Sequence, residues 1–248
     1  MSNIRNLQRS IQFFHRSGPM GCPYLEGRVE RKLFTRLPAD PVVAQRLNAD
    51  LSKAGFRRSH DILYKPICDR CSACVPVRIP VRRFQATRSI RRIQRANVDL
   101  VVSACAPIAG EEDFSLFRRY QKARHPDSDM AHMSESDYQA MVEEGSAGTV
   151  VFQFRQKGGA KDGTLAGVMI SDRLDDGYSA VYSFFEADGT REGLGTMMIV
   201  ALIEQARDEG LDNVYLGYWI EQSRKMAYKV RFKPVEYLTS DGWREQNS

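Results

Sequence analysis

Several features that would define other protein classes are missing from this 248-residue chain. No apolar run approaches the roughly 20 residues that a membrane-spanning helix needs. The first residues lack the apolar core and small-residue end of a secretory signal. The five cysteines are an odd number, which fits a reducing compartment better than a disulfide scaffold. These absences argue against a membrane protein and predict a cytoplasmic location.

Acidic residues are scarce in the first part of the chain. Residues 1–105 carry 20 Lys and Arg against 7 Asp and Glu, whereas residues 106–248 carry 16 against 24. Between residues 70 and 98 there is no acidic residue at all. This asymmetry indicates that the basic part meets a polyanion, although charge alone does not separate this reading from a solvated basic face.

The charge of the acid-free stretch comes from arginine and never from lysine. Guanidinium groups bind phosphate through two parallel hydrogen bonds, so the stretch is typical of nucleic-acid contact. Four of its arginines recur at spacings of three and four, and a short helix would present them on one basic face. The predicted nucleic-acid contacts are Arg82, Arg83, Arg88, Arg91, Arg92 and Arg95.

The chain divides near residues 104–113, where proline, glycine and alanine interrupt the pattern. We expect a smaller N-terminal cysteine-containing α/β domain at residues 1–105. A larger domain follows at residues 106–248.

The larger domain shows a regular order of elements. Strands are predicted at 149–155, 164–174 and 178–185, and they form an antiparallel meander. A glycine-opened amphipathic helix follows, and then a strand at 213–219 that the helical crossover places parallel to the third. This order is the core of the GNAT acyltransferase fold. The predicted class is therefore α+β.

Three cysteines lie at successive two-residue gaps, at Cys68, Cys71 and Cys74, and Cys22 lies upstream. Thiolates at such spacing can hold a tetrahedral Zn²⁺ or an iron–sulfur cluster. The second pair of the usual metal site is missing, however, and structural thiols in a reduced core are the alternative. The sequence leaves the metal open, and we expect no other cofactor.

The loop "SFFEADGTREGLG" occupies the position where a GNAT enzyme does its chemistry. Glu186 and Asp188 are the candidate catalytic carboxylates, although loop carboxylates are often solvated caps. Backbone N–H groups at the start of the following helix can receive an anion or an oxyanion. Arg191 precedes the Gly-x-Gly by one residue, whereas acetyl-CoA users place two residues there, which counts against coenzyme A.

The segment "GYWIEQSRKMAYKVRF" at 217–232 mixes large aromatics with basic side chains and is expected to form one wall of a cleft. Aromatic faces there would stack on unpaired bases, although Tyr218 and Trp219 are also ordinary core residues. Arg78 follows the cysteine cluster and could point into a cleft between the domains. The candidate substrate-binding residues are Arg78, Arg124, Tyr218, Trp219, Lys225, Tyr228 and Lys229.

Four segments together resemble the bacterial branch of the arginyl-tRNA–protein transferase family. They read "GCPYLEGRVERKLFTRL", "CSACVPVRIPV", "SIRRIQRANVDL" and "YLGYWIEQSRKMAYKVRFKPVE", in order along nearly the whole chain. The resemblance implies an aspartate/glutamate leucyltransferase, which moves leucine from leucyl-tRNA to the N-terminal Asp or Glu of proteins in the N-end rule degradation pathway. It also implies that the arginines named above contact tRNA. The cysteine pattern departs from that of the eukaryotic branch, so no metal is carried over.

Three alternatives remain at this stage. An arginyl-tRNA user would differ only in its donor pocket. A GNAT N-acetyltransferase would bind acetyl-CoA and not tRNA, so the basic charge of the first half would have no polyanion to bind. A non-catalytic RNA-binding protein would keep the arginines without needing the glycine-opened loop.

Overall fold

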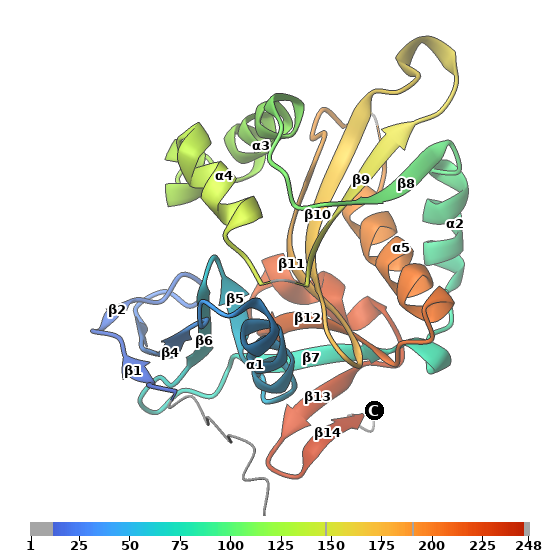
Figure 1. Cartoon of the computed structure of the whole chain (residues 1–248). Helices are drawn as coiled ribbons and strands as arrows, with labels where there is room; N and C mark the ends of the chain where they lie inside the picture. Colours follow the sequence, from blue (N-terminus) through green and yellow to red (C-terminus); the bar gives the residue numbers. More distant parts are fainter. Residues whose placement is uncertain (1–11, 147, 190, 246–248) are drawn as a thin grey trace, which may run out of the picture.

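The computed structural model describes residues 12–146, 148–189 and 191–245. The described residues form one large sheet, one small sheet and a two-stranded ribbon (Figure 1). The small sheet has the order β1 (His15–Arg16), β4 (Lys32–Arg36), β6 (Ile62–Pro66), β5 (Arg57–Ser59). The ribbon pairs β2 (Met20–Gly21) with β3 (Val29–Glu30), and α1 (Pro41–Lys53) precedes β5.

The large sheet has eight strands. Their order is β14 (Gly242–Glu245), β13 (Glu236–Thr239), β7 (Val75–Pro80), β12 (Asn213–Trp219), β11 (Gly177–Phe185), β10 (Leu165–Arg173), β9 (Thr149–Gln156), β8 (Leu100–Cys105). The meander β9–β10–β11 is antiparallel and β12 is parallel to β11, which confirms the predicted order of elements.

Helices cover both faces of this sheet because its strands are apolar on both sides (Figure 1). Met169 packs with α5 (Leu194–Asp208) and α2 (Arg88–Ala96), whereas its neighbours Val168 and Ile170 pack with α3 (Glu111–Arg124) and α4 (Glu135–Glu143). This alternation is the two-residue period of a strand. The fold is α+β and GNAT-like, as predicted.

The segment from 75 to 105 belongs to the large sheet although it was assigned to the basic N-terminal part. β7 lies between β12 and β13, and β8 pairs with β9 at the far edge. Helix α2 connects β7 to β8 in the chain and packs against α5. The domain boundary after residue 105 stays a prediction, but the sheet shows that the two parts share one layer of strands.

No helix in the described ranges is both long and apolar enough to cross a bilayer.

Candidate active site

Strands β11 and β12 separate at their carboxyl ends, and a cavity of about 640 Å³ opens between them. Their parallel pairing covers only the steps from Gly177 with Asn213 to Ser179 with Tyr215. The cavity is lined by β11, β12 and α5, together with the end of α3 and the 3₁₀ helix η4 (Arg224–Arg231). This separation is the one that the GNAT-like core predicts.

A β-bulge in each strand lies where the two strands part. In β11 the register with β10 passes over Val181, because Ile170 pairs with Tyr182 and Ser171 pairs with Ala180. In β12 the register with β7 passes over the residue before Gly217. A bulge bends its strand and redirects its backbone groups. The two bulges therefore turn strand backbone toward the cavity.

Arg57 of β5 fits between the two bulges. Its Nη2 donates to the carbonyl oxygens of Ala180 (2.7 Å) and Val181 (3.1 Å). Gly217 has φ +74°, and a Cβ built there would lie 2.5 Å from Arg57 Nε, so only glycine leaves room for this side chain. The other terminal nitrogen, Nη1, is buried and has no hydrogen-bond partner among the described residues.

Lys229 lies in the same cavity as Arg57 and is a buried cation. Its Nζ donates to the carbonyl oxygen of Tyr218 at 2.6 Å. Burial, and then the charge of Arg57, lower the pKa of Lys229 to about 7. An amine in this state binds a proton at little cost once an anion approaches.

The mouth of the cavity adds further basic groups. Arg124 and His125 come from the end of α3, and Lys225 and Tyr228 come from η4. Burial lowers the pKa of His125, and the charges of Lys225 and Arg124 lower it further. None of the described residues that line the cavity is Asp or Glu. The cavity is thus suited to an anionic ligand.

Four predicted substrate-binding residues therefore meet in one place: Arg124, Lys225, Tyr228 and Lys229 line the cavity. Arg78 does not join them. Its Nε donates to Glu236 Oε2 at 2.7 Å, and its guanidinium stacks over the Trp243 ring at 4.7 Å. Val77 packs in the core, whereas the Arg78 side chain is covered by Glu236 and Trp243 of the C-terminal hairpin. Arg78 was expected to point into a cleft between the domains, and it instead lies against the C-terminal hairpin.

The two aromatics of β12 also lie outside the cavity lining. Tyr218 is buried, and its hydroxyl lies 2.9 Å from Gly55 O and 3.1 Å from Tyr64 O. Trp219 packs edge-on against Tyr237, with ring centroids 5.5 Å apart. The core alternative considered for both residues fits these contacts.

The two candidate catalytic carboxylates lie at the end of β11, and neither lines the cavity. Glu186 accepts a hydrogen bond from Arg119 Nη2 at 2.9 Å. Asp188 is exposed on the following loop and contributes to the electrostatic environment of Arg191. Their catalytic roles stay predictions.

Helix α2 covers the start of α5, where a coenzyme A pyrophosphate would lie in an acetyltransferase. A Cβ at Gly193 would lie 2.8 Å from the Ile93 side chain, so the two helices touch there. Arg191 is held by Asp99 through two hydrogen bonds of 2.9 and 2.5 Å. Asn97 Nδ2 donates to the Glu192 carbonyl at 3.2 Å. The Arg191 guanidinium is therefore held by Asp99, and α2 packs directly on the start of α5.

The predicted basic helix exists as α2, and Thr87 caps its start by accepting from Ile90 N. Ile90 is buried, whereas the four arginines of the helix are exposed: Arg88, Arg91, Arg92 and Arg95. Arg92 pairs with Glu192 at 2.6 Å, and both side chains remain largely exposed. The helix therefore presents one basic face, as its spacing predicted.

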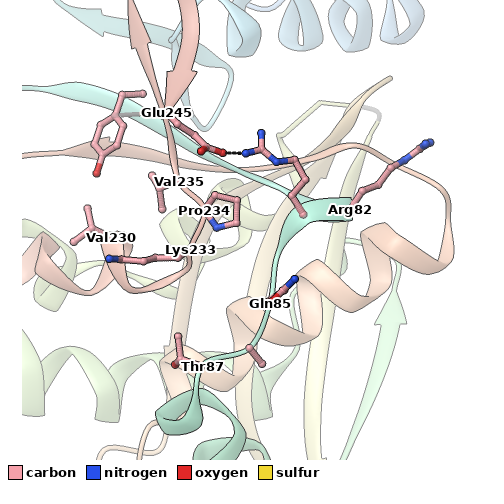
Figure 2. Close-up of a pocket in the computed structure, with 11 residues that line it drawn as sticks. Arg82, Gln85, Thr87, Val230, Lys233, Pro234, Val235 and Glu245 are labelled. Carbon is pink, nitrogen blue, oxygen red and sulfur yellow. Dashed lines mark hydrogen bonds and ion pairs between the residues drawn. The ribbon is translucent and has the colours of Figure 1, made fainter. Parts of the chain in front are cut away.

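Arg82 and Arg83 line a groove of about 1020 Å³ next to α2 (Figure 2). The groove runs from Thr87 at the start of α2 to Val230 of η4, and Lys233 also borders it. Arg82 pairs with Asp212 at 3.2 Å, and Arg83 pairs with Glu245. Val230 lines the groove and Lys229 lines the cavity, so η4 stands between them.

The cysteines at 22, 68, 71 and 74 are free thiols and half-buried. Burial, and then the neighbouring thiols of Cys68, Cys22 and Cys71, raise the pKa of Cys74 to about 12. The four therefore lie in one neighbourhood. Within the described ranges, however, no three His, Cys, Asp or Glu side chains are grouped so that they could hold a metal ion.

Sequence reasoning missed Arg57 and set His125 aside. Arg57 stands in "FRRSH", an ordinary basic pair in the first domain, and nothing in its neighbours indicates a cavity. Its role depends on two strands that lie far along the chain.

Comparison with known proteins places the chain in one family. The family models for the N terminus and C terminus of arginine-tRNA-protein transferase match residues 20–92 and 112–239. The aspartate/glutamate leucyltransferase of Granulibacter bethesdensis is 46% identical over 98% of this chain and 89% of its own. Those of Parvibaculum lavamentivorans and Rhodospirillum rubrum are 49% and 48% identical, each over 93% of this chain and over 93% and 92% of their own.

Among solved structures, L-PGS from Bacillus licheniformis superimposes with a TM-score of 0.50 at 10% identity. The match covers 82% of this chain and 67% of that chain, and it shows a shared fold alone. The sequence relatives are the stronger evidence for the family, because they match nearly the whole chain and almost half of the aligned residues are identical. The chain belongs to the arginine-tRNA-protein transferase family.

Proposed function

We propose that this protein moves leucine from leucyl-tRNA to the N-terminal Asp or Glu of acceptor proteins. The observation that carries the proposal is the cavity between β11 and β12, whose described lining has four Lys and Arg side chains and no carboxylate. An acidic acceptor residue finds cations there, whereas a basic one meets repulsion with no compensating partner. The curated relatives described above bear the same activity in their names.

The same lining favours leucine over arginine as the transferred residue. Met169, Ile199 and Leu216 give the cavity an apolar side that suits an aliphatic side chain. An arginyl group would bring a further guanidinium into a site that already holds Arg57 and Lys229. Burying a charge without a partner is costly, so the arginyl donor is disfavoured.

The chemistry asks little of the protein because the donor ester is already activated. The acceptor α-amine, whose ordinary pKa is about 7.7–8.0, is partly neutral at pH 7. Its nitrogen attacks the leucyl carbonyl carbon, a tetrahedral oxyanion forms, and the tRNA ribose oxygen leaves with a proton while the peptide bond closes. The cavity between β11 and β12 would hold the acceptor amine and the leucyl ester in attack geometry. This positioning accounts for most of the rate enhancement. Glu186 and Asp188 remain the proposed proton acceptors.

A direct test uses radiolabelled leucyl-tRNA and arginyl-tRNA with peptides that begin with Asp, Glu, Asn or Lys. We expect label from leucine to appear only on the Asp and Glu peptides. Acetyl-CoA in place of charged tRNA should give no acetylated peptide, because α2 covers the start of α5. Equal transfer from arginyl-tRNA, or transfer to the Lys peptide, would contradict the proposal.

The basic face of α2 and the adjoining groove are the proposed tRNA surface, with the groove leading toward η4 and the cavity. Since α2 is exposed and its arginines reach solvent, they would contact phosphate rather than bases. A donor of this kind also places the reaction in the cytoplasm.

The tRNA surface can be tested on the arginines of α2. Replacing Arg88, Arg91 and Arg92 together by Ala should weaken binding of every tRNA sequence. The slope of log K against log salt should become shallower by roughly 2 to 3 for three lost phosphate contacts. Fluorescence anisotropy at several salt concentrations measures both, and Arg46→Ala on α1 is a control with an exposed arginine outside this face. An unchanged slope in the triple variant would rule the surface out.

A further inference from the structure

Two neighbouring arginines of β5, Arg57 and Arg58, differ in how fully their guanidinium groups are hydrogen-bonded. Arg58 is fully buried and its guanidinium is matched by Asp172, at 2.6 Å from Nε and 2.8 Å from Nη2. Arg57 points to the other side, where two backbone carbonyls receive it and, among the residues that the structure describes, no carboxylate lines the cavity. The same short strand thus carries one satisfied guanidinium and one that is half-satisfied.

The unpaired Nη1 of Arg57 is the important atom. A buried guanidinium N–H without an acceptor is rare, because leaving it unpaired costs much of its hydration energy. The protein keeps this atom in place through specific features: the bulge at Val181, which brings two successive carbonyls to Nη2, and Gly217, which makes room for the side chain. Such an arrangement is typical of a donor that is held ready for a ligand.

Lys229 adds a second cation to the site around Arg57. Its Nζ lies in the same cavity, has one backbone acceptor, and retains donors for a ligand. The lowered pKa of Lys229 arises partly from Arg57, so the two cations repel each other. One anion placed between them removes that repulsion, supplies the acceptor that Arg57 Nη1 lacks and gives Lys229 Nζ a second acceptor.

We propose that Arg57 Nη1 and Lys229 Nζ together bind the side-chain carboxylate of the acceptor's N-terminal Asp or Glu. This assignment rests on the proposed function, and it names the residues that select the acceptor. Arg124 and Lys225 lie nearer the mouth, where the rest of the acceptor chain enters. A tRNA phosphate is the less suitable ligand for the inner pair, because the exposed arginines of α2 and the groove already offer phosphate contacts.

The experiment measures peptide binding and leucine transfer separately. Isothermal calorimetry compares matched peptides that begin with Asp and with Asn, using the wild type, Arg57→Met, Lys229→Met and the control Arg46→Met. We expect the wild type and the control to prefer the Asp peptide by about 10- to 100-fold, and the two cavity variants to lose the preference. In transfer assays the loss should appear mainly in KM for the acidic peptide. Release of leucine from leucyl-tRNA to hydroxylamine, an acceptor with no carboxylate, should persist.

Three results would overturn the assignment. The first is an unchanged Asp preference in Arg57→Met, and the second is no preference in the wild type. The third is an equal loss of tRNA binding and peptide binding in Arg57→Met, which would give Arg57 to the donor. If the wild type binds the Asp peptide through Arg57 and yet transfers no leucine to it, the proposed function fails while the carboxylate site stands.

A second variant covers the event that Arg57→Met does not fold. Arg57→Ala should regain binding of the Asp peptide when guanidinium ion is added at millimolar concentration, since the ion can occupy the space beside Gly217. Arg57→Lys keeps the charge but loses the second nitrogen, so it should restore less than a tenth of the wild-type preference. Full activity in Arg57→Lys would contradict a role for Nη1.

Discussion

Replacing Asp172 by Asn should lower the free energy of unfolding by about 3–5 kcal/mol. Asp172 is fully buried and accepts hydrogen bonds from Arg58, from Asn48 Nδ2 at 2.9 Å and from Thr149 Oγ1 at 2.9 Å. These groups join the small sheet, α1 and the large sheet. An amide in place of the carboxylate leaves the buried Arg58 charge uncompensated and turns an NH₂ group toward other donors.

Urea denaturation followed by circular dichroism measures this loss. Asp175→Asn is the matched control, because Asp175 also pairs with a basic side chain, Lys53 at 2.5 Å, but is largely exposed. Exposed pairs contribute about 0–1 kcal/mol, so the control should stay close to the wild type. The expectation fails if the two substitutions cost the same.

Wild-type stability should rise relative to Lys229→Met as the pH is raised from 7 to 10. The folded protein holds Lys229 with a pKa of about 7, against an ordinary value of 10.5. Between these values the unfolded chain binds more protons than the folded chain, so deprotonation favours the folded state. Each pH unit contributes at most about 1.4 kcal/mol, which gives a relative gain of roughly 3–4 kcal/mol over this range.

Parallel urea titrations of the two proteins at pH 7, 8, 9 and 10 give the difference directly. Tyrosine and other titrations are common to both proteins and cancel in the comparison. Below pH 7 the difference should level off, because the lysine is then protonated in both states. A difference that does not vary with pH would show that Lys229 is hydrated in the folded protein.

The order of elements in the catalytic core could be read from the sequence because each signal is local. The glycines and turn residues around β10 and β11, and the apolar stripe of α5, each specify their own element. The exposed arginines of α2 were predictable for the same reason. Their spacing defines a helix face, and the buried Ile90 lies on the other side.

The centre of the site could not be read in this way. Arg57 acquires its role from bulges in β11 and β12, and a bulge is a property of a strand pair that one strand's sequence does not reveal. Arg78 shows the reverse error. Its face of β7 was predictable from the alternation with Val77, but the Trp243 and Glu236 side chains that cover that face belong to a hairpin at the far end of the chain.

The position of β7 in the sheet has a consequence for how this protein is made. Both neighbours of β7, the strands β12 and β13, are synthesised only after the whole of residues 81–212. Until then β7, which is rich in valine and isoleucine, remains on the growing chain with both edges unpaired. Closure of the sheet therefore has to wait for the synthesis of β12 and β13, and pairings this distant in sequence form slowly.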